Sequence, residues 1–491
     1  MPKPEQPLPT ATLRREEIAL IEVGHTTVTP ATVHVLLAFF LMAIAVVPIA
    51  EWTGVRALRA EGVATSWSHL SDLPGEIRYY AAGATLRPRS GQAAAAEESG
   101  WWPLVVSTNR IVLAGLSGFE RALEDESLLG RSLRPPAQVV MTGWLGVGNE
   151  RVYRGRDGWL FYRPDVEYIT GRGFLDPAQL RRRVATASEW TTPPRPDPRE
   201  AIAQFRRDLE ARGITLIVMP TPLKPGVHPE MLARRYADAT GALQNPSYRA
   251  FVDDLRRDGV LVFDPSAALA AARRSGPQYL VADTHWRPET MEGVAELLGG
   301  FIAAHVGLPV KADPGYRLER PEVRNTGDAA RMLDLPADGL LFPPEAVWLR
   351  RVLQPDGSPW RSSRDADVFV LGDSFSNIYA LESMGWGTSA GFAEQLSYTL
   401  RRPVDRLVQN DEGAFATRAM LRRDPDRLNG KRVVVYQFAA RELAFGDWKV
   451  IPLPAPRAGA FDLERGSGQA ATDGQHPSGD AGLVFTSPDT R

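Results

Sequence analysis

The chain has 491 residues, 44% of them hydrophobic, so it can form one large domain with accessory segments. Its 57 lysines and arginines nearly balance 59 aspartates and glutamates, and this balance excludes a general attraction to nucleic acid. Cysteine is absent, which excludes disulfides, thiolate metal ligands and thiol catalysis.

The first predicted element is a membrane-spanning helix over residues 31–50. Residues 26–50 contain no Asp, Glu, Lys or Arg, and 20 residues of helix would cross about 30 Å, the thickness of a bilayer core. A cleaved signal peptide usually has an apolar region of only about 7–15 residues, and a buried core helix fits poorly with the polar flanks. We therefore expect a retained anchor, although the flanking charges do not decide its orientation.

The segment 51–145 is mixed in composition, and we expect it to form a helical stalk or connector. Residues 146–451 are expected to form the main domain, because short apolar strands alternate there with amphipathic helices. Such alternation predicts an α/β fold, a parallel sheet covered by helices on both faces. The predicted strands are 214–220, 260–265, 367–371, 403–408 and 432–438, and the predicted helices are 199–212, 248–258, 289–304 and 413–424. The Gly, Ser, Asp and Pro-rich residues 452–491 predict a disordered tail.

Ser374 follows the predicted strand 367–371 in the sequence LGDSFS. Ligands of open parallel sheets bind outside the carboxyl ends of the strands, so this serine would lie where a substrate is expected to bind. A nucleophile is one interpretation. The alternative is that Asp373 or Ser374 caps the helix that follows.

Asp283 and His285 supply a second candidate element in the sequence ADTHW. A serine nucleophile needs a base, and the base needs an acid that orients it, so Asp-x-His could provide both. Local packing of the two residues is the alternative. Among the histidines of the α/β region, His305 is expected to end a helix, and no histidine pair has the spacing of metal ligands. We expect no metal.

Further candidates are weaker. Lys224 or His228, in the proline-rich loop 218–230, could point at a substrate, although a rigid connector explains this loop at least as well. Trp286 could form an apolar wall on which a sugar stacks, or it could be a core residue.

Taken in order, five motifs resemble the SGNH hydrolase-like alginate O-acetyltransferases of the AlgJ/AlgX type. They are GRDGWLFY (155–162), MPTPLKP (219–225), ADTHW (282–286), LGDSFSNIY (371–379) and QFAAREL (437–443). The resemblance covers residues 145–450 and is closer to the anchored AlgJ type, because the residues after 452 are too few for the added carbohydrate-binding domain of AlgX.

The resemblance implies a Ser-His-Asp triad in which Ser374 is the nucleophile, His285 the general base and Asp283 its orienting acid. Asn410 would correspond to the asparagine that helps to stabilise the oxyanion, although Val408 stands where a glycine is usual. Gly385, in MGWGTSAGF, could supply another amide, as could Gly387 or Gly391. For Arg441 and Glu442 we expect a structural ion pair.

The implied activity is transfer of an acetyl group through an acyl-enzyme to hydroxyls of an exported polysaccharide, alginate or a similar polymer. Residues 1–30 would then be cytoplasmic, the helix 31–50 would cross the inner membrane once, and the catalytic domain would lie in the periplasm. No bound cofactor is expected. The acetyl group would come from a membrane O-acyltransferase of the MBOAT type or from another acetyl donor. The polysaccharide export machinery is a further expected partner. An exported carbohydrate or lipid esterase, or a non-catalytic subunit of an export complex, are the alternative functions.

Overall fold

The computed structural model describes residues 29–42, 45, 68–78, 102–126, 128–186, 192–336, 340–410 and 413–455. The chain divides into two compact units, one of residues 1–154 with 328–344 and the other of residues 155–327 with 345–491. Most of the expected disordered tail, from residue 456 onward, lies outside the described residues.

The first unit is mainly helical where it is described. Residues 30–42 are helical, whereas residues 43, 44 and 46–50 of the expected anchor lie outside the described residues. Across the described ranges, no helix combines the length and apolar character needed to cross a membrane. The named elements of this unit are α3 (Ser68–Ser71), α5 (Trp102–Glu126), α6 (Leu128–Val139), the π-helix η1 (Val140–Trp144), β1 (Val152–Arg154) and α15 (Asp328–Arg331).

The second unit is built on a parallel five-stranded sheet in the order β10-β9-β11-β3-β4. The strands are β3 (Thr215–Thr221), β4 (Leu261–Val262), β9 (Val368–Gly372), β10 (Val404–Val408) and β11 (Val433–Ala439). Four of them match a predicted range to within one residue at each end, and β4 lies inside the longer predicted range 260–265, so the predicted parallel sheet is confirmed. All residues of β9 and β11 are buried, as expected of strands covered on both faces.

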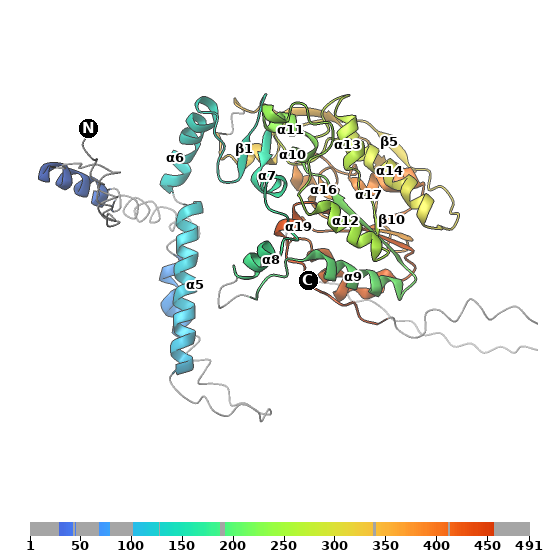
Figure 1. The fold of residues 1–491 in the computed structure, drawn as a ribbon, viewed down its shortest axis with the longest axis horizontal. Helices are drawn as coiled ribbons and strands as arrows, with labels where there is room; N and C mark the ends of the chain where they lie inside the picture. Colours follow the sequence, from blue (N-terminus) through green and yellow to red (C-terminus); the bar gives the residue numbers. More distant parts are fainter. Residues whose placement is uncertain are drawn as a thin grey trace, which may run out of the picture. The chain divides into compact units, whose positions relative to one another are not determined.

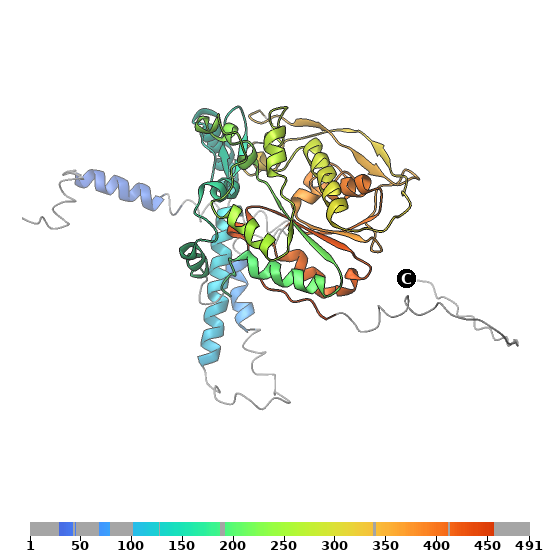
Figure 2. The same ribbon diagram turned by 45° about the vertical axis from the view of Figure 1, so that its right-hand side comes forward.

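Helices cover both faces of this sheet. Figure 2 shows the green helix α9 (Pro198–Glu210) on one side of the sheet and the yellow helix α14 (Pro288–His305) with α17 (Phe392–Leu400) on the other. Helix α12 (Tyr248–Arg257) lies beside α9 (Figure 1), and α18 (Ala416–Arg423) fulfils the last helix prediction. The remaining helices are α7 (Arg163–Thr170), α8 (Pro177–Val184), α10 (Lys224–Val227), α11 (Pro229–Leu232), η2 (Arg234–Tyr236), α13 (Ser266–Ala272), α16 (Ser374–Asn377), η3 (Glu382–Met384), η4 (Pro425–Leu428) and α19 (Glu442–Phe445).

The connection from α9 to β3 illustrates how sequence produces these elements. Asp197 caps α9 by accepting a hydrogen bond from the Arg199 N–H at 3.0 Å, and Pro198 occupies the first helical turn. Gly213 ends the helix in the left-handed conformation, with a φ of 69°. The apolar strand β3 follows directly, so its carboxyl end reaches the same sheet edge as that of β9.

Short antiparallel strands lie outside the main sheet. Strand β5 (Arg317–Glu319) pairs with β8 (Arg351–Leu353), and β6 (Glu322–Asn325) pairs with β7 (Glu345–Trp348). Strand β2 (Leu160–Tyr162) completes the set within the second unit.

Candidate active site

Ser374 stands at the first position of helix α16, directly after strand β9. The helix is capped by Asp373, whose Oδ1 accepts a hydrogen bond from the Phe375 N–H at 2.9 Å. The second oxygen, Oδ2, accepts from the Ala439 N–H at 2.6 Å. Asp373 therefore performs the capping role, and the Ser374 hydroxyl is left for another partner.

That partner is His285. The Ser374 Oγ lies 2.9 Å from His285 Nε2, and His285 Nδ1 lies 2.7 Å from Asp283 Oδ1. In the arrangement consistent with these distances, Nδ1–H donates to the carboxylate and Nε2 accepts from the serine hydroxyl. The structure thus brings together the three residues that the sequence analysis selected.

Asp283 is held in a buried, hydrogen-bonded setting. The residue is 1% exposed, and its Oδ1 also accepts from the His285 N–H at 3.0 Å. The indole of Trp386 donates to Oδ2 at 3.0 Å. Burial by itself would raise the pKa of the Asp283 carboxyl, but hydrogen bonds and charge from His285, together with the Trp386 indole, outweigh burial and hold that pKa below its usual range. The acid is therefore ionised at neutral pH.

The turn that carries Ser374 is tied to the sheet by Gln437 of β11, which the sequence analysis did not single out. Its side-chain oxygen accepts from the Asp373 N–H at 3.0 Å and from the Ser376 hydroxyl at 2.7 Å. Its amide group donates at 2.8 Å both to Thr221 Oγ1 and to Asp373 Oδ1. A buried glutamine in a strand carries no pattern that reveals such partners.

Trp286 is not a sugar-stacking wall, so this expectation was wrong. Its side chain has no solvent exposure, its indole donates to the Phe375 carbonyl at 3.1 Å, and its ring packs against those of Phe375 and Phe392. A ring enclosed in this way cannot contact a polymer, and the core interpretation is correct.

Lys224 does not point at a substrate either. Its buried ammonium donates to the carbonyls of Leu160, Val281 and Asp283 at 2.6, 2.7 and 2.9 Å. Two of these carbonyls belong to the loop that carries Asp283 and His285. Lys224 therefore stabilises the backbone of the loop that carries two residues of the candidate triad.

His228, the other histidine of interest in the proline-rich loop, is buried and bonded locally. Its Nε2 accepts from the Gln278 N–H at 2.9 Å, and its Nδ1 lies 2.9 Å from Glu230 Oε1. These contacts give it a structural position apart from Ser374.

Gly385 cannot offer its amide to a reacting oxygen, contrary to expectation. It ends helix η3 in the left-handed conformation, and its N–H donates to the Glu382 carbonyl at 2.8 Å. The predicted ion pair between Arg441 and Glu442 is also not formed among the described residues. Arg441 instead bonds Asp165 of helix α7 at 3.0 Å.

A small cavity of about 50 Å³ opens beside Ser374, and Asn410 is one of the residues that line it. The Asn410 Oδ1 accepts from Asn377 Nδ2 at 3.0 Å, which fixes the amide beside helix α16. The Ser374 N–H, the first of that helix, has no hydrogen-bond acceptor in the described part of the chain. Further lining residues are Gly413, Ala414, Thr417, Phe438 and Arg441. The cavity therefore combines the serine with an unused amide and a fixed asparagine.

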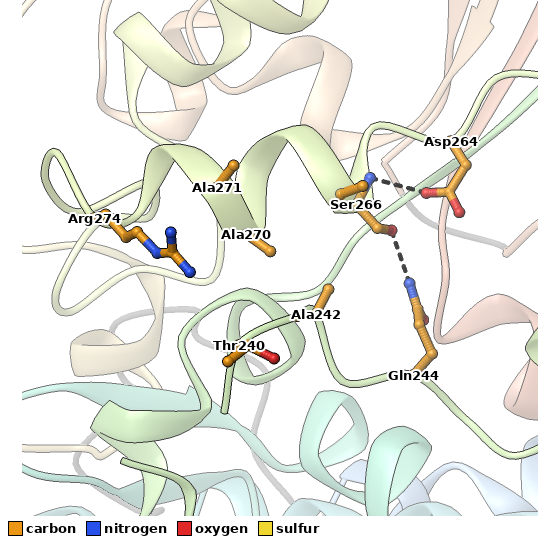
Figure 3. Close-up of a pocket in the computed structure, with 10 residues that line it drawn as sticks. Thr240, Ala242, Gln244, Asp264, Ser266, Ala270, Ala271 and Arg274 are labelled. Atoms are coloured by element: carbon orange, nitrogen blue, oxygen red, sulfur yellow. Dashed lines mark hydrogen bonds between the residues drawn. The ribbon is translucent and has the colours of Figure 1, made fainter. Parts of the chain in front are cut away.

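A larger hollow of about 410 Å³ lies elsewhere, over helix α13 (Figure 3). Its Ser266 N–H donates to Asp264 at 2.9 Å, and its hydroxyl accepts from the Gln244 amide at 2.8 Å. No histidine lines this hollow, so the larger volume does not make Ser266 a counterpart of Ser374.

Comparison with known proteins places these residues within a family. Residues 152–440 match the model described as the SGNH hydrolase-like domain of acetyltransferase AlgX, and this match covers more than half of the chain. A Pseudomonas aeruginosa protein named probable alginate O-acetylase AlgJ is 26% identical over 313 residues, 60% of this chain and 71% of that protein. The protein of the same name from Pseudomonas syringae pv. tomato is 25% identical over 252 residues, which span 50% of this chain and 61% of that protein.

Two solved structures are also similar. The O-acetyltransferase domain of Pseudomonas putida AlgJ aligns with a TM-score of 0.45 and 22% identity, over 60% of this chain and 92% of that one. The structure of Pseudomonas aeruginosa AlgX aligns with a TM-score of 0.41 and 17% identity, over 60% of this chain and 65% of that one.

Proposed function

We propose that this chain, which belongs to the family of SGNH hydrolase-like acetyltransferase domains of AlgX, acetylates hydroxyls of an exported polysaccharide through Ser374, His285 and Asp283. The observation that carries the proposal is the line of contacts from Ser374 Oγ to His285 Nε2, at 2.9 Å, and from His285 Nδ1 to Asp283, at 2.7 Å. Alginate is the first polymer to test, because the relatives are named alginate O-acetylases.

The first half of the reaction loads the enzyme. Ser374 Oγ bonds to the carbonyl carbon of an acetyl donor, and its proton moves to His285 Nε2. The acyl bond of the donor then breaks, and the leaving group takes the proton from His285. Asp283 remains ionised throughout and stabilises the imidazolium that forms between these steps.

The second half transfers the acetyl group to the acceptor. A sugar hydroxyl gives its proton to His285 Nε2 as its oxygen bonds to the acetyl carbon, and the ester bond to Ser374 breaks. Ser374 recovers the proton from His285. The oxyanion of each tetrahedral intermediate would lie against the unused Ser374 N–H, with the Asn410 side chain, which lines the same cavity, as a further candidate donor.

The wider setting forms part of the proposal. The chain would be held in the inner membrane by residues 31–50, with the catalytic unit in the periplasm. A membrane O-acyltransferase of the MBOAT type would pass the acetyl group across that membrane. No bound cofactor takes part, because Ser374 itself carries the acetyl group.

The test is acetylation of the full chain by an aryl acetate, followed by addition of an alginate oligosaccharide. We expect a mass increase of one acetyl group on the peptide that contains Ser374, and acetylated oligosaccharide after the acceptor is added. Ser374→Ala should abolish both products. Ser362→Ala is the matched control, because Ser362 is exposed and bonds Asp405 at 2.9 Å, away from His285.

Two results would redirect the proposal. Release of acetate with no product that depends on the acceptor would identify an esterase that uses the same triad. Unchanged polymer acetylation in cells that carry Ser374→Ala would favour a non-catalytic subunit of an export complex.

A further inference from the structure

We propose that Trp386 is a positioning residue of the reaction, which holds the Asp283 carboxylate in the plane that aligns His285 with Ser374. The inference rests on the proposed function and adds a fourth residue to its machinery. Trp386 lies 103 positions along the chain from Asp283, and its indole N–H donates to Asp283 Oδ2 at 3.0 Å.

The contacts of Asp283 divide between its two oxygens. On Oδ1, the carboxylate accepts from His285 twice, from the imidazole at 2.7 Å and from the backbone N–H at 3.0 Å. On Oδ2, it accepts from the Trp386 indole. A carboxylate held at Oδ1 alone could rotate about its Cβ–Cγ bond. The bond to Oδ2 opposes that rotation, so the direction in which Oδ1 receives the imidazole is defined from the opposite side.

A left-handed backbone turn on both sides of Trp386 directs its indole toward Asp283. The flanking residues Gly385 and Gly387 have φ angles of 82° and 98°, in the left-handed region that side chains rarely adopt. Space is restricted as well, because a Cβ atom on Gly387 would lie 2.9 Å from the Leu349 Cδ1, and one on Gly385 would collide with Asn325. Gly385 and Gly387 therefore form a left-handed turn around Trp386.

Core packing holds the Trp386 indole in one position. Trp386 has no solvent exposure, and the ring of Tyr379 packs edge-on against it with 6.4 Å between centroids. The Tyr379 hydroxyl donates to the Trp286 carbonyl at 2.7 Å, next in sequence to His285. The turn, the indole and the Asp-x-His loop are thus connected by direct contacts. A buried N–H directed at a buried carboxylate is costly to leave unpaired, which gives this contact its positioning strength.

The decisive variant is Trp386→Phe in the full chain, which keeps a buried ring and removes the N–H. A hydrogen bond to a charged group of this kind corresponds to roughly 10- to 100-fold in rate, so we expect kcat for acetyl transfer from an aryl acetate to fall by that factor. The KM for the oligosaccharide acceptor should stay the same, because the indole does not reach the cavity. The NMR resonance of the His285 Nδ1–H should also shift, since its acceptor is reoriented.

Trp360→Phe is the matched control. Trp360 is 5% exposed, and its indole donates to the Ser397 hydroxyl at 3.0 Å, so the same substitution removes the same kind of buried bond without touching Asp283. If Trp386→Phe and Trp360→Phe have equal kcat values, Trp386 is only structural and the inference is overturned.

A second variant guards against misfolding of Trp386→Phe. Replacement of Trp386 by benzothienylalanine keeps the shape of the indole and puts sulfur in place of the N–H. The same loss of kcat in this variant supports the inference, and wild-type kcat overturns it. Neither result bears on the proposed function, which Ser374→Ala tests separately.

Discussion

The turn that carries Ser374 and the loop that carries Asp283 and His285 reach the same site by different means. The turn follows a central strand and is tied to its neighbours by Gln437 of β11. The loop belongs to no strand of the main sheet, and buried side chains from distant segments hold it. Lys224 donates to its backbone carbonyls, and Trp386 donates to the Asp283 carboxylate. The sheet therefore positions Ser374, whereas the positions of His285 and Asp283 depend on a few long-range polar contacts.

The largest effect in this comparison is expected at Lys224, on the loop side. Lys224→Met should lower the free energy of unfolding by about 3–5 kcal/mol, because three buried carbonyls lose their charged donor. Activity should fall with it, since the Asp283 carbonyl is one of the three. Urea unfolding and transfer kinetics would measure both quantities.

Lys449→Met is the control for Lys224. The Lys449 side chain is 48% exposed and lies 3.4 Å from Asp447, so its loss should cost at most about 1 kcal/mol. Equal losses in the two variants would contradict the view that the loop depends on its buried lysine.

Gln437→Leu tests the turn side, with a smaller expected effect of about 2–3 kcal/mol in the free energy of unfolding. The bonds that it removes are made by a neutral side chain, and β9 remains paired with β10 and β11 on either side. We expect kcat to fall because the Asp373 N–H and the Ser376 hydroxyl lose their acceptor beside Ser374.

Gln204→Leu provides the reference for Gln437. Gln204 is a partly exposed residue of helix α9 that bonds Asp208 at 2.8 Å. Its replacement should leave kcat unchanged and should change the free energy of unfolding by no more than about 0.5 kcal/mol. A Gln437→Leu variant with wild-type kcat would show that the sheet alone positions Ser374.

The smallest effect is expected at the turn around Trp386. Gly387→Ala should destabilise the protein by about 1–2 kcal/mol, because alanine resists a φ of 98° and its Cβ would press on Leu349. Gly293→Ala, inside helix α14 with open space around the added Cβ, should have the opposite sign and stabilise by about 0.5–1 kcal/mol. Thermal unfolding of the pair compares them directly. If both variants are stabilised, the left-handed turn is not needed to present the indole.

The prediction of the fold followed from local patterns. Apolar runs such as 367–371 and 432–438 became β9 and β11, since a strand buried on both faces must be apolar along its whole length. The candidate nucleophile and base were found in the same way, because each follows an identifiable element or motif.

The errors came from judging side chains by their type alone. Lys224 and Trp286 are residues that often bind substrates, yet the core encloses both of them completely. Gly385 was expected to supply an amide, but that N–H already bonds the Glu382 carbonyl. Exposure and hydrogen-bond partners depend on segments far away in the chain, so periodicity and motif spacing do not contain them.

By itself, the sequence determined the strands, the helices between them, and the edge at which Ser374 would stand, because these follow from hydrophobic periodicity and turn residues within short windows. Only the tertiary structure decided that His285 lies 2.9 Å from Ser374 across 89 positions of chain, and that Trp386, Lys224 and Gln437 support them. The physical reason is that a buried polar group takes whichever partner the packed core places beside it, and that choice is made only when distant segments meet.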